Sequence, residues 1–313
     1  MNNSQPSQLK LLLAFAAIYF IWGSTYLAIE FSIETLPPYL MTGVRFFLAG
    51  VLLYAWARWR GAEKPTLIHW RSATLIGGLM LFGGMGTVAY AQQWVDSGLA
   101  ALLIAMVPIW MVLIEWIRPG GSRPGIRVFI GILVSFAGLV LLIGPGDVFG
   151  STSNDNLIGG SMVLLATLLW SIGSIFSRIV KLPNSSMLST AMQMFAASIL
   201  LMLMGVFQGE MSQINVETIS LKSVLSMLYL SIIGSVVAFT AYIWLLKVAP
   251  PARVATYAYV NPVIAIFLGW ALNNEAITTP MITGAALIIT AVVIIVSQQQ
   301  KRSKATSRSR RLT

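Results

Sequence analysis

The chain has 313 residues, of which 57% are hydrophobic and only 10% are charged. Soluble domains carry roughly 25% charged residues, so this composition excludes a water-soluble fold and predicts a protein whose main solvent is lipid. The single His and the absence of Cys exclude disulfides, thiolate nucleophiles, iron–sulfur clusters and Cys-built zinc sites, and we expect neither a metal nor another cofactor.

The net charge of +10 does not indicate a nucleic-acid partner. The basic residues are scattered between apolar runs and gather in a tail from Lys301 to Arg311, a pattern typical of loops held at an anionic membrane surface. A signal peptide is an alternative for the start, because Lys10 precedes an apolar run. That run stays apolar through Ile29, which is long enough to span a membrane. We therefore expect membrane lipid as a partner and no nucleic acid.

Ten apolar segments are long enough to cross the bilayer as helices, which takes about 20 residues each. Turn-forming Pro and Gly residues separate several of them, at 37–38, 119–121, 144–146 and 250–251. The sequence therefore predicts an all-α integral membrane protein with ten transmembrane helices. The predicted spans, in chain order, are 11–30, 37–57, 71–91, 98–117, 126–144, 157–178, 186–207, 223–246, 252–272 and 280–298.

The positions of Lys and Arg predict the orientation. All but two of the 20 basic residues lie in the N-terminus, in the C-terminal tail or in the connections that follow every second span. The exceptions are Lys222, in a connection of the other parity, and Arg45, inside the second span. Cytoplasmic loops are the ones enriched in Lys and Arg, so both termini are predicted to be cytoplasmic.

An internal repeat relates the two halves of the chain. Residues 22–47 match residues 170–195 at a constant offset of 148, which pairs Trp22 with Trp170 and Arg45 with Gln193. Five spans per half is an odd number, so the halves must be inserted in opposite orientations, as inverted repeats of transporters are. The predicted domains are a cytoplasmic N-terminus (1–10), a first five-helix repeat (11–145), a periplasmic connecting loop (146–156), a second five-helix repeat (157–298) and a basic cytoplasmic tail (299–313).

Several short motifs occur along the chain in an order that is known from one family. They are Trp22-Gly23-Ser24-Thr25-Tyr26, Arg45-Phe46, Val107-Pro108, Tyr259-Val260-Asn261-Pro262-Val263 and Asn274-Glu275. With these motifs, residues 11–298 resemble the EamA-like ten-helix exporters of the drug/metabolite transporter superfamily. The chain departs from the family at Gly121-Ser122, where a Gly-Glu pair is common, and this affects only a short loop. The resemblance implies a multi-pass exporter of the bacterial inner membrane.

Enzymatic alternatives lack the necessary residues. Residues 144–147 fit the GxGD pattern of intramembrane aspartyl proteases, but Asp96 and Asp155 both fall in predicted outer loops, so the second membrane aspartate is missing. His69 has no His or Cys partner, so neither a metal site nor a Ser–His arrangement can form around it. We therefore predict no catalytic residues.

Arg45 is the most informative single residue. It lies about 12 Å from Pro37 along the second span, so its charge falls close to the membrane midplane, where it costs about 2.5–3.5 kcal/mol. In one interpretation its guanidinium holds a substrate carboxylate or phosphate. In the other it is structural, bonded to helix-end carbonyls or paired with Glu30 or Glu34. Both interpretations stay open at this stage.

Aromatic residues predict the rest of a substrate cavity. Trp22 and Trp170 occupy equivalent places near the middles of spans one and six, where interfacial anchoring does not explain them. Other rings and a few polar groups complete a lining suited to amphipathic or aromatic small molecules, with ordinary packing as the alternative for each. The predicted substrate-binding residues are Trp22, Ser24, Arg45, Tyr90, Trp110, Trp170, Gln193, Tyr242, Tyr257 and Asn261.

Pro108 and Pro262 are predicted hinges, because each removes a backbone hydrogen bond near the centre of its helix, at matching depth in the two halves. Packing kinks are the alternative. The sequence places no acidic residue at the membrane midplane to couple transport to proton flow, because the acidic residues lie in loops or near helix ends. This favours export down a gradient, with Glu30 and Glu115 as less obvious coupling groups.

The sequence therefore predicts a small-molecule exporter (for metabolites, amino acids or drug-like compounds) that works by alternating access around a cavity between inverted repeats. The competing hypothesis is a membrane scaffold or receptor without a transport cycle. The expected partners are the small-molecule substrate and lipid, with the protein as a monomer or a homodimer.

Overall fold

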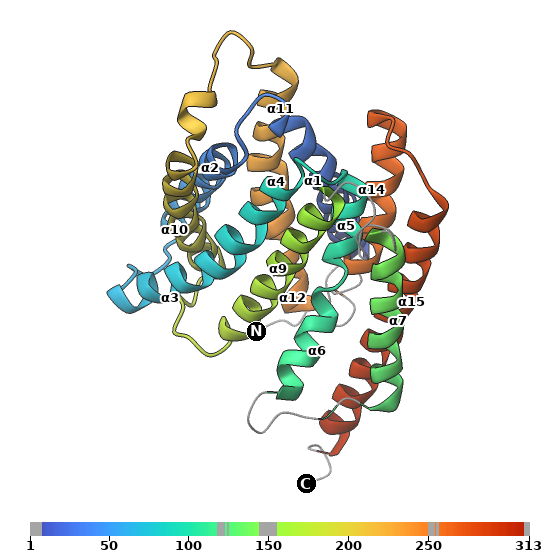
Figure 1. Ribbon diagram of the computed structural model, residues 1–313. Coiled ribbons are helices and arrows are strands. Elements are labelled where there is room, and N and C mark those ends of the chain that lie inside the picture. Colours follow the sequence, from blue (N-terminus) through green and yellow to red (C-terminus); the bar gives the residue numbers. More distant parts are fainter. Residues whose placement is uncertain are drawn as a thin grey trace.

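The computed structural model describes residues 8–117, 123, 125–143, 155–249, 254 and 257–309, and these residues form helices and loops without strands (Figure 1). Within these ranges, seven helices are long and apolar enough to cross a membrane, and shorter apolar helices cover 126–138, 260–273 and 279–294. The predicted all-α fold is confirmed for this part of the chain. The GxGD motif, the connecting loop before Asp155 and the turn at 119–121 lie outside the described residues.

The described helices follow the predicted spans. The ends differ most at α15, which continues to Ser309 instead of ending near 298, because the polar segment after the apolar part is rich in the good helix formers Gln, Lys, Arg and Ala. The first half contains α1 (Gln8–Ile33), α2 (Pro38–Trp59), α3 (Leu67–Gly77), η1 (Gly78–Gly86), α4 (Thr87–Ala91), α5 (Ser97–Ile104), α6 (Val107–Ile117) and α7 (Ile126–Ile143). The second contains α9 (Asp155–Phe176), α10 (Ser186–Phe207), η2 (Glu210–Gln213), α11 (Leu221–Tyr229), η3 (Leu230–Val237), α12 (Ala238–Val248), α14 (Tyr257–Asn273) and α15 (Thr279–Ser309).

Two spans are π-helical in their middle. The segment η1 joins α3 to α4, and η3 joins α11 to α12. In η3 the amide of Ala238 bonds to the carbonyl of Ile233, five residues back, which is the π-helical pattern. Leu230 follows Gly78 by 152 positions, close to the offset of the sequence repeat, so the two π-helical segments occupy equivalent places in the two halves.

The matched prolines behave differently. At Pro108 the predicted span is broken, because α5 ends at Ile104 and α6 begins at Val107, with tight turns at Ala105 and Met106. Pro262 instead lies inside the continuous helix α14. The span is therefore interrupted just before Pro108, whereas the helix around Pro262 is continuous, and both hinges remain predictions.

Helices of the first half pack against helices of the second in a crosswise manner. The helix α1 contacts α14, α12 and α11, and α9 contacts α6 and η1. The π-helical segments follow the same pattern, since η1 contacts α9 and α10 while η3 contacts α1 and α2. Two equivalent pairs, α2 with α10 and α7 with α15, lie side by side (Figure 1).

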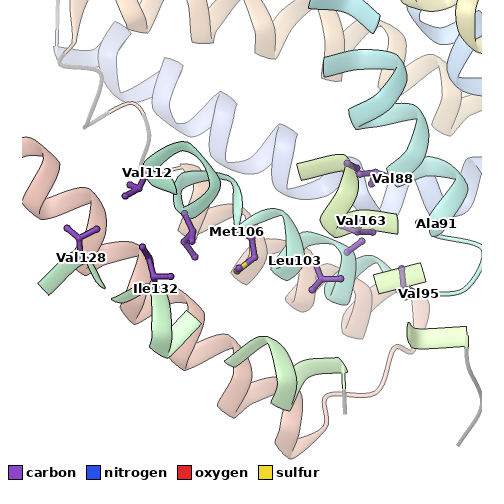
Figure 2. Close-up of a cluster of buried hydrophobic side chains, with 12 residues drawn as sticks. Val88, Ala91, Val95, Leu103, Met106, Val112, Val128, Ile132 and Val163 are labelled. Carbon is purple, nitrogen blue, oxygen red and sulfur yellow. The ribbon is translucent and has the colours of Figure 1, made fainter. Parts of the chain in front are cut away.

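An apolar core fixes the break in the fourth span against its neighbours. Leu103 and Met106, on either side of the turn, are fully buried, and Val163 of α9 and Ile132 of α7 belong to the same cluster (Figure 2). Close packing of this kind transmits displacements rather than absorbing them. The junction between α5 and α6 is therefore held on both sides by apolar contacts.

Carboxylates tie the ends of the α2–α10 pair. Glu210, which follows α10, accepts hydrogen bonds from the amides of Tyr39 and Leu40 in the first turn of α2, at 3.1 and 2.8 Å. Glu63, which follows α2, accepts one from the amide of Asn184 just before α10, at 2.8 Å. The two helices are therefore antiparallel, and each end of the pair has a carboxylate at a helix N-terminus, where the unpaired amides and the helix dipole favour negative charge.

Glu210 gives the stability a predictable pH dependence. Burial raises the pKa of the Glu210 carboxyl above its ordinary value, although the amides of Leu40 and Tyr39 act in the opposite direction. A carboxyl that binds its proton more tightly when folded destabilises the protein as the pH rises through the interval between its unfolded and folded pKa values. We expect the melting temperature of the wild type, relative to that of Glu210→Gln, to fall as the pH rises from about 4.3 and then to level off.

Glu217→Gln, in the same loop but exposed, is the control for removing a loop carboxylate. The pH series uses purified protein in detergent. A difference between wild type and Glu210→Gln that is constant or grows with pH would contradict the expectation.

Candidate functional site

Trp22 is the centre of an aromatic cluster. Its ring centroid lies 5.1 Å from that of Tyr242 on α12 and 5.0 Å from that of Tyr257 on α14, and the rings of Tyr242 and Tyr257 are 6.0 Å apart. Phe239 adds an edge contact at 6.3 Å. These are favourable tilted and edge-to-face geometries, and they bring together three predicted site residues from both halves of the chain.

The same tryptophan is bonded to the π-helical segment η3. Its indole Nε1 donates to the carbonyl oxygen of Gly234 at 3.2 Å. One turn away, the hydroxyls of Ser24 and Tyr229 are 2.6 Å apart. The predicted residues Trp22 and Ser24 therefore face η3, an element that the sequence analysis did not identify.

Arg45 reaches η3 from α2. Its side chain is 4% exposed, its Nε donates to the hydroxyl of Ser235 at 3.3 Å, and its Nη1 has no hydrogen-bond partner. The guanidinium carbon also lies 5.0 Å from the centre of the Phe46 ring. We call the group formed by Trp22, Ser24, Arg45, Gly234, Ser235, Tyr242 and Tyr257 the η3 cluster.

The predicted pairing of Arg45 with Glu30 or Glu34 is wrong. Glu30 accepts from Asn273 and from the amide of Ser97, and Glu34 is bound to Lys222 at 2.5 Å. Both carboxylates lie at the C-terminal end of α1, where cationic and amide donors are nearer. Arg45 instead donates a hydrogen bond to Ser235 in the π-helical segment η3.

Asn261 lies beside the aromatic cluster and is buried. With its amide nitrogen oriented toward backbone acceptors, it donates to the carbonyls of Tyr257 and Tyr19, at 3.2 Å each. Tyr257 is one turn earlier on α14 and Tyr19 is on α1. Asn261 therefore joins two helices, and its hydrogen bonds are those of a positioning residue for Tyr257.

The remaining predicted residues lie apart from this cluster. Trp170 packs against η1, with ring carbon Cε3 only 3.2 Å from where a Cβ on Gly84 would lie, whereas Trp22 contacts η3 through its hydrogen bond to Gly234. Gln193 donates to the hydroxyl of Ser189 at 3.0 Å. Tyr90 stacks on Tyr39, with ring centroids 4.7 Å apart, and Trp110 donates to the hydroxyl of Thr167 at 2.9 Å. The structure thus groups the other six predicted residues at or beside the η3 cluster and leaves these four outside it.

Comparison with known proteins decides the family. Residues 9–144 and 157–297 match the EamA-like transporter family. The chain belongs to this family. It is 36% identical over 271 residues to an uncharacterised inner membrane transporter, YedA, of Escherichia coli K12, covering 86% of this chain and 85% of that protein. It is 25% identical to the uncharacterised transporter YoaV of Bacillus subtilis, covering 89% and 94% of the two chains.

A solved structure described only as a crystal structure of protein shares the fold. It aligns with a TM-score of 0.63 over 94% of this chain and 99% of its own, at 21% identity. The EamA-like match, the named relatives and the apolar helices together identify a multi-pass inner membrane protein and a membrane transporter.

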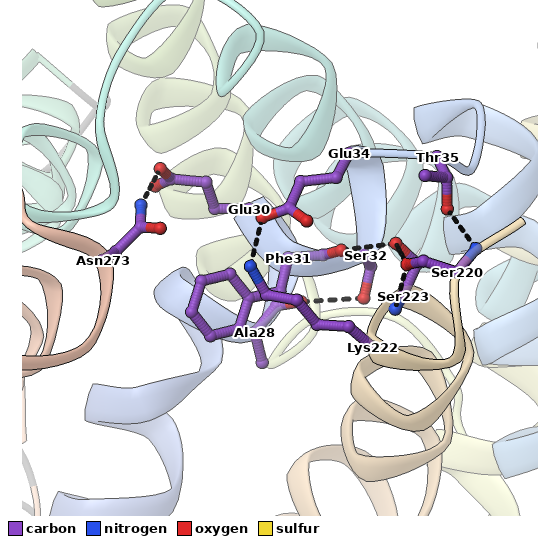
Figure 3. A network of polar contacts seen from close by, with 10 residues as sticks. All are labelled: Ala28, Glu30, Phe31, Ser32, Glu34, Thr35, Ser220, Lys222, Ser223 and Asn273. Carbon is purple, nitrogen blue, oxygen red and sulfur yellow. Dashed lines mark hydrogen bonds and ion pairs between the residues drawn. The ribbon is translucent and has the colours of Figure 1, made fainter. Parts of the chain in front are cut away.

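In this EamA-like protein, two carboxylates from opposite halves meet at one helix end, which sequence reasoning missed as a pair. Glu30 accepts from the amide of Ser97 at 2.9 Å. It also accepts from Asn273 at 2.5 Å (Figure 3). Glu275 accepts from the hydroxyl of Ser97 at 2.5 Å and from the amide of Gly98 at 3.1 Å. The sequence did point to Glu275, because Asn274-Glu275 is one of the family motifs. The spacing of residues, however, does not show that Glu275 contacts α5.

The C-terminal end of α1 in the EamA-like fold also binds α11. Lys222 pairs with Glu34 and lies over the ring of Phe31, and Ser223 donates to the carbonyl of Phe31 at 2.7 Å (Figure 3). Among the residues that the structure describes, no group of three or more His, Cys, Asp or Glu side chains could hold a metal ion. The chemistry that the η3 cluster offers is therefore aromatic contact, hydroxyl hydrogen bonding and one buried positive charge.

Proposed function

We propose that this EamA-like protein exports small molecules across the inner membrane by alternating access. In this proposal the chain crosses the bilayer ten times with both ends in the cytoplasm, and residues 11–145 and 157–298 are inverted repeats. The substrate binds between the repeats, and the direction of transport is outward, as the family resemblance implies.

The observation that carries the proposal is the crosswise exchange of equivalent contacts. The helix α1 packs on η3 and α12, while its counterpart α9 packs on η1 and α4. The π-helical segments η1 and η3 carry matched Trp contacts, from Trp170 and Trp22. Inverted repeats that exchange conformations convert one open side into the other, so equivalent surfaces in the two halves are what such a cycle needs.

The proposed substrate-binding residues are those of the sequence analysis, and they differ in whether they belong to the η3 cluster. Trp22, Ser24, Arg45, Tyr242 and Tyr257 lie within the η3 cluster, and Asn261 lies beside it. Trp170 and Gln193 form the equivalent position in the other half, with Tyr90 and Trp110 toward its ends. Pro108 is the proposed hinge with the stronger support, since its helix is interrupted there.

Transport is tested by comparing metabolite pools and tolerance to toxic amino acids and drugs in cells with and without the protein. An exporter lowers the cytosolic accumulation of at least one compound. Unchanged pools across the panel would favour a scaffold or receptor. Vesicles with and without an imposed pH gradient then separate export down a gradient from proton antiport.

Topology is tested in the same cells, because the chain has no Cys. Single cysteines replace Val216, which is 79% exposed, and Leu67, which is 68% exposed, and a membrane-impermeant maleimide is added. The proposed orientation requires labelling at position 216 in intact spheroplasts and labelling at position 67 only after permeabilisation. The reverse pattern, or equal labelling, contradicts it.

Trp22→Ala is expected to reduce export about tenfold or more while the protein still reaches the membrane. The change removes both ring contacts and the hydrogen bond to Gly234, and a loss of about 1.4 kcal/mol is already tenfold. Trp22→Phe keeps a ring and is expected to be intermediate. Trp59→Ala is the control, because Trp59 is 82% exposed. Export that is equal in the Trp22 and Trp59 variants would remove Trp22 from the site.

A further inference from the structure

Arg45 carries a buried positive charge whose hydrogen-bonding capacity is largely unused. A guanidinium has five N–H donors in a planar fork, and here Nε bonds to Ser235 while Nη1 has no partner. The nearest acidic candidates by sequence, Glu30 and Glu34, are bound elsewhere. A charged group that is 4% exposed and forms no ion pair with the residues that the structure describes is costly, so its position needs a ligand or a compensating function.

The guanidinium lies beside η3. Nη2 is 3.9 Å from where a Cβ on Gly234 would be, an ordinary van der Waals distance, so the guanidinium is close to the helix backbone at Gly234. The carbonyl of Gly234 is already taken by the indole of Trp22. The hydroxyl of Ser235 accepts from Arg45 and donates its own proton to the carbonyl of Leu230 at 2.9 Å, so it holds the guanidinium in place. A planar anion at this point would meet the unpartnered donors of Arg45.

The charge balance selects the kind of anion. Arg45 is the one basic residue in the interior of a predicted span, since the other basic residues within span bounds stand at span ends, so it can neutralise a monoanion but not a dianion. A carboxylate matches the fork of a guanidinium in two parallel hydrogen bonds. The rings of Trp22, Tyr242 and Tyr257 belong to the same η3 cluster as Arg45, and they offer an apolar and aromatic surface.

We propose that the substrates are organic monoanions whose carboxylate binds the guanidinium of Arg45 and whose aromatic or apolar part lies against Trp22, Tyr242 and Tyr257. This inference rests on the proposed export function and adds the substrate class. It excludes neutral and purely cationic compounds as the preferred cargo. It also assigns Ser235, which the sequence analysis did not select, as the acceptor that orients the guanidinium of Arg45 toward the anion.

The test measures binding to purified full-length protein in detergent, from the rise in melting temperature with ligand concentration. The probes are 3-phenylpropionate, its neutral amide 3-phenylpropionamide, and phenyl phosphate. We expect the wild type to bind the carboxylate about tenfold or more tightly than the amide, because hydrogen bonds between charged groups are the strong ones, and more tightly than the phosphate. Arg45→Gln is expected to bind acid and amide equally.

Matched variants separate recognition from stability. Arg45→Lys keeps the charge without the planar fork and is expected to show a reduced preference, which also covers the case in which Arg45→Gln fails to fold. Lys222→Gln removes an exposed positive charge, with a side chain 46% exposed, and is expected to behave as the wild type. Ser235→Ala is expected to weaken carboxylate binding without abolishing it.

Three results overturn the inference: no binding of the carboxylate, equal affinity of the wild type for acid and amide, or a full preference that survives in both Arg45 variants. Preferential binding of phenyl phosphate overturns the assignment to carboxylates. The export function fails independently, when no compound pool changes in cells. Lower pools of neutral or cationic compounds, together with no carboxylate preference, would leave the exporter standing and reject the anion class.

Discussion

Gly77→Ala is expected to lower the amount of folded protein severely. A Cβ on Gly77 would overlap the carbonyl oxygen of Gln193 on α10 and lie 3.1 Å from the carbonyl carbon and Cα of the same residue. These are backbone atoms in the middle of a packed helix, so they cannot move aside as a flexible side chain can. Overpacking costs about 1–3 kcal/mol and sometimes more, and here it separates α3 from α10.

The neighbouring glycine supplies the control. A Cβ on Gly78 would meet only the side chain of Leu200, at 3.5 Å, which is an ordinary contact. Membrane levels and the melting temperature in detergent are compared for Gly77→Ala and Gly78→Ala. Equal values for the two variants would show that α3 and α10 can separate without cost, against the close packing described above.

Glu275→Ala is the second change with a large expected effect. The Glu275 side chain is 9% exposed and fills the space beside Gly269, whose missing Cβ lets the carboxylate lie there. Its removal leaves the hydroxyl of Ser97 and the amide of Gly98 without their acceptor. Each buried donor without a partner costs about 1–3 kcal/mol, so we expect a clearly lower melting temperature in detergent.

Glu34→Gln is the matched control at the same end of the molecule. Glu34 and Lys222 form an ion pair with side chains 40% and 46% exposed, and exposed pairs contribute about 0–1 kcal/mol. Its melting temperature is expected to stay near that of the wild type. A Glu275 variant as stable as the Glu34 variant would mean that water replaces the lost acceptor.

The helical course of the chain was predictable because it depends on hydrophobic length alone. Apolar runs of about 20 residues and turn-forming Pro and Gly residues place helices wherever lipid is the solvent. The repeat offset of 148 also placed Trp22 and Trp170 on equivalent sites, and the structure bonds or packs both against a π-helical segment.

The π-helical segments were not predicted, because periodicity over a fully apolar span does not distinguish 3.6 from 4.4 residues per turn. The glycines at 77–86 allow close helix contact, since Gly77 and Gly86 both lie against α10. Whether part of a span becomes π-helical depends on how it packs against neighbouring helices, which is a tertiary property.

The partners of charged residues were the least predictable part of the site. Pairing of Arg45 with Glu30 or Glu34 was one of the alternatives left open, yet Arg45 contacts Ser235, 190 positions away. Glu210 and Glu275 cap helices of the other half, α2 and α5, through backbone amides that every sequence has. Sequence alone therefore identifies the charge but not the helix end that binds it.

The crosswise contacts also have a consequence for synthesis. The ribosome completes α1, α2 and α7 before it makes α14, α10 and α15, the helices against which they pack. Until then, the faces of the early helices have only lipid or the translocation machinery beside them. The first half is therefore expected to need its second half to become resistant to quality-control proteases. Two half-chains made separately in one cell should protect each other, whereas either alone should be degraded.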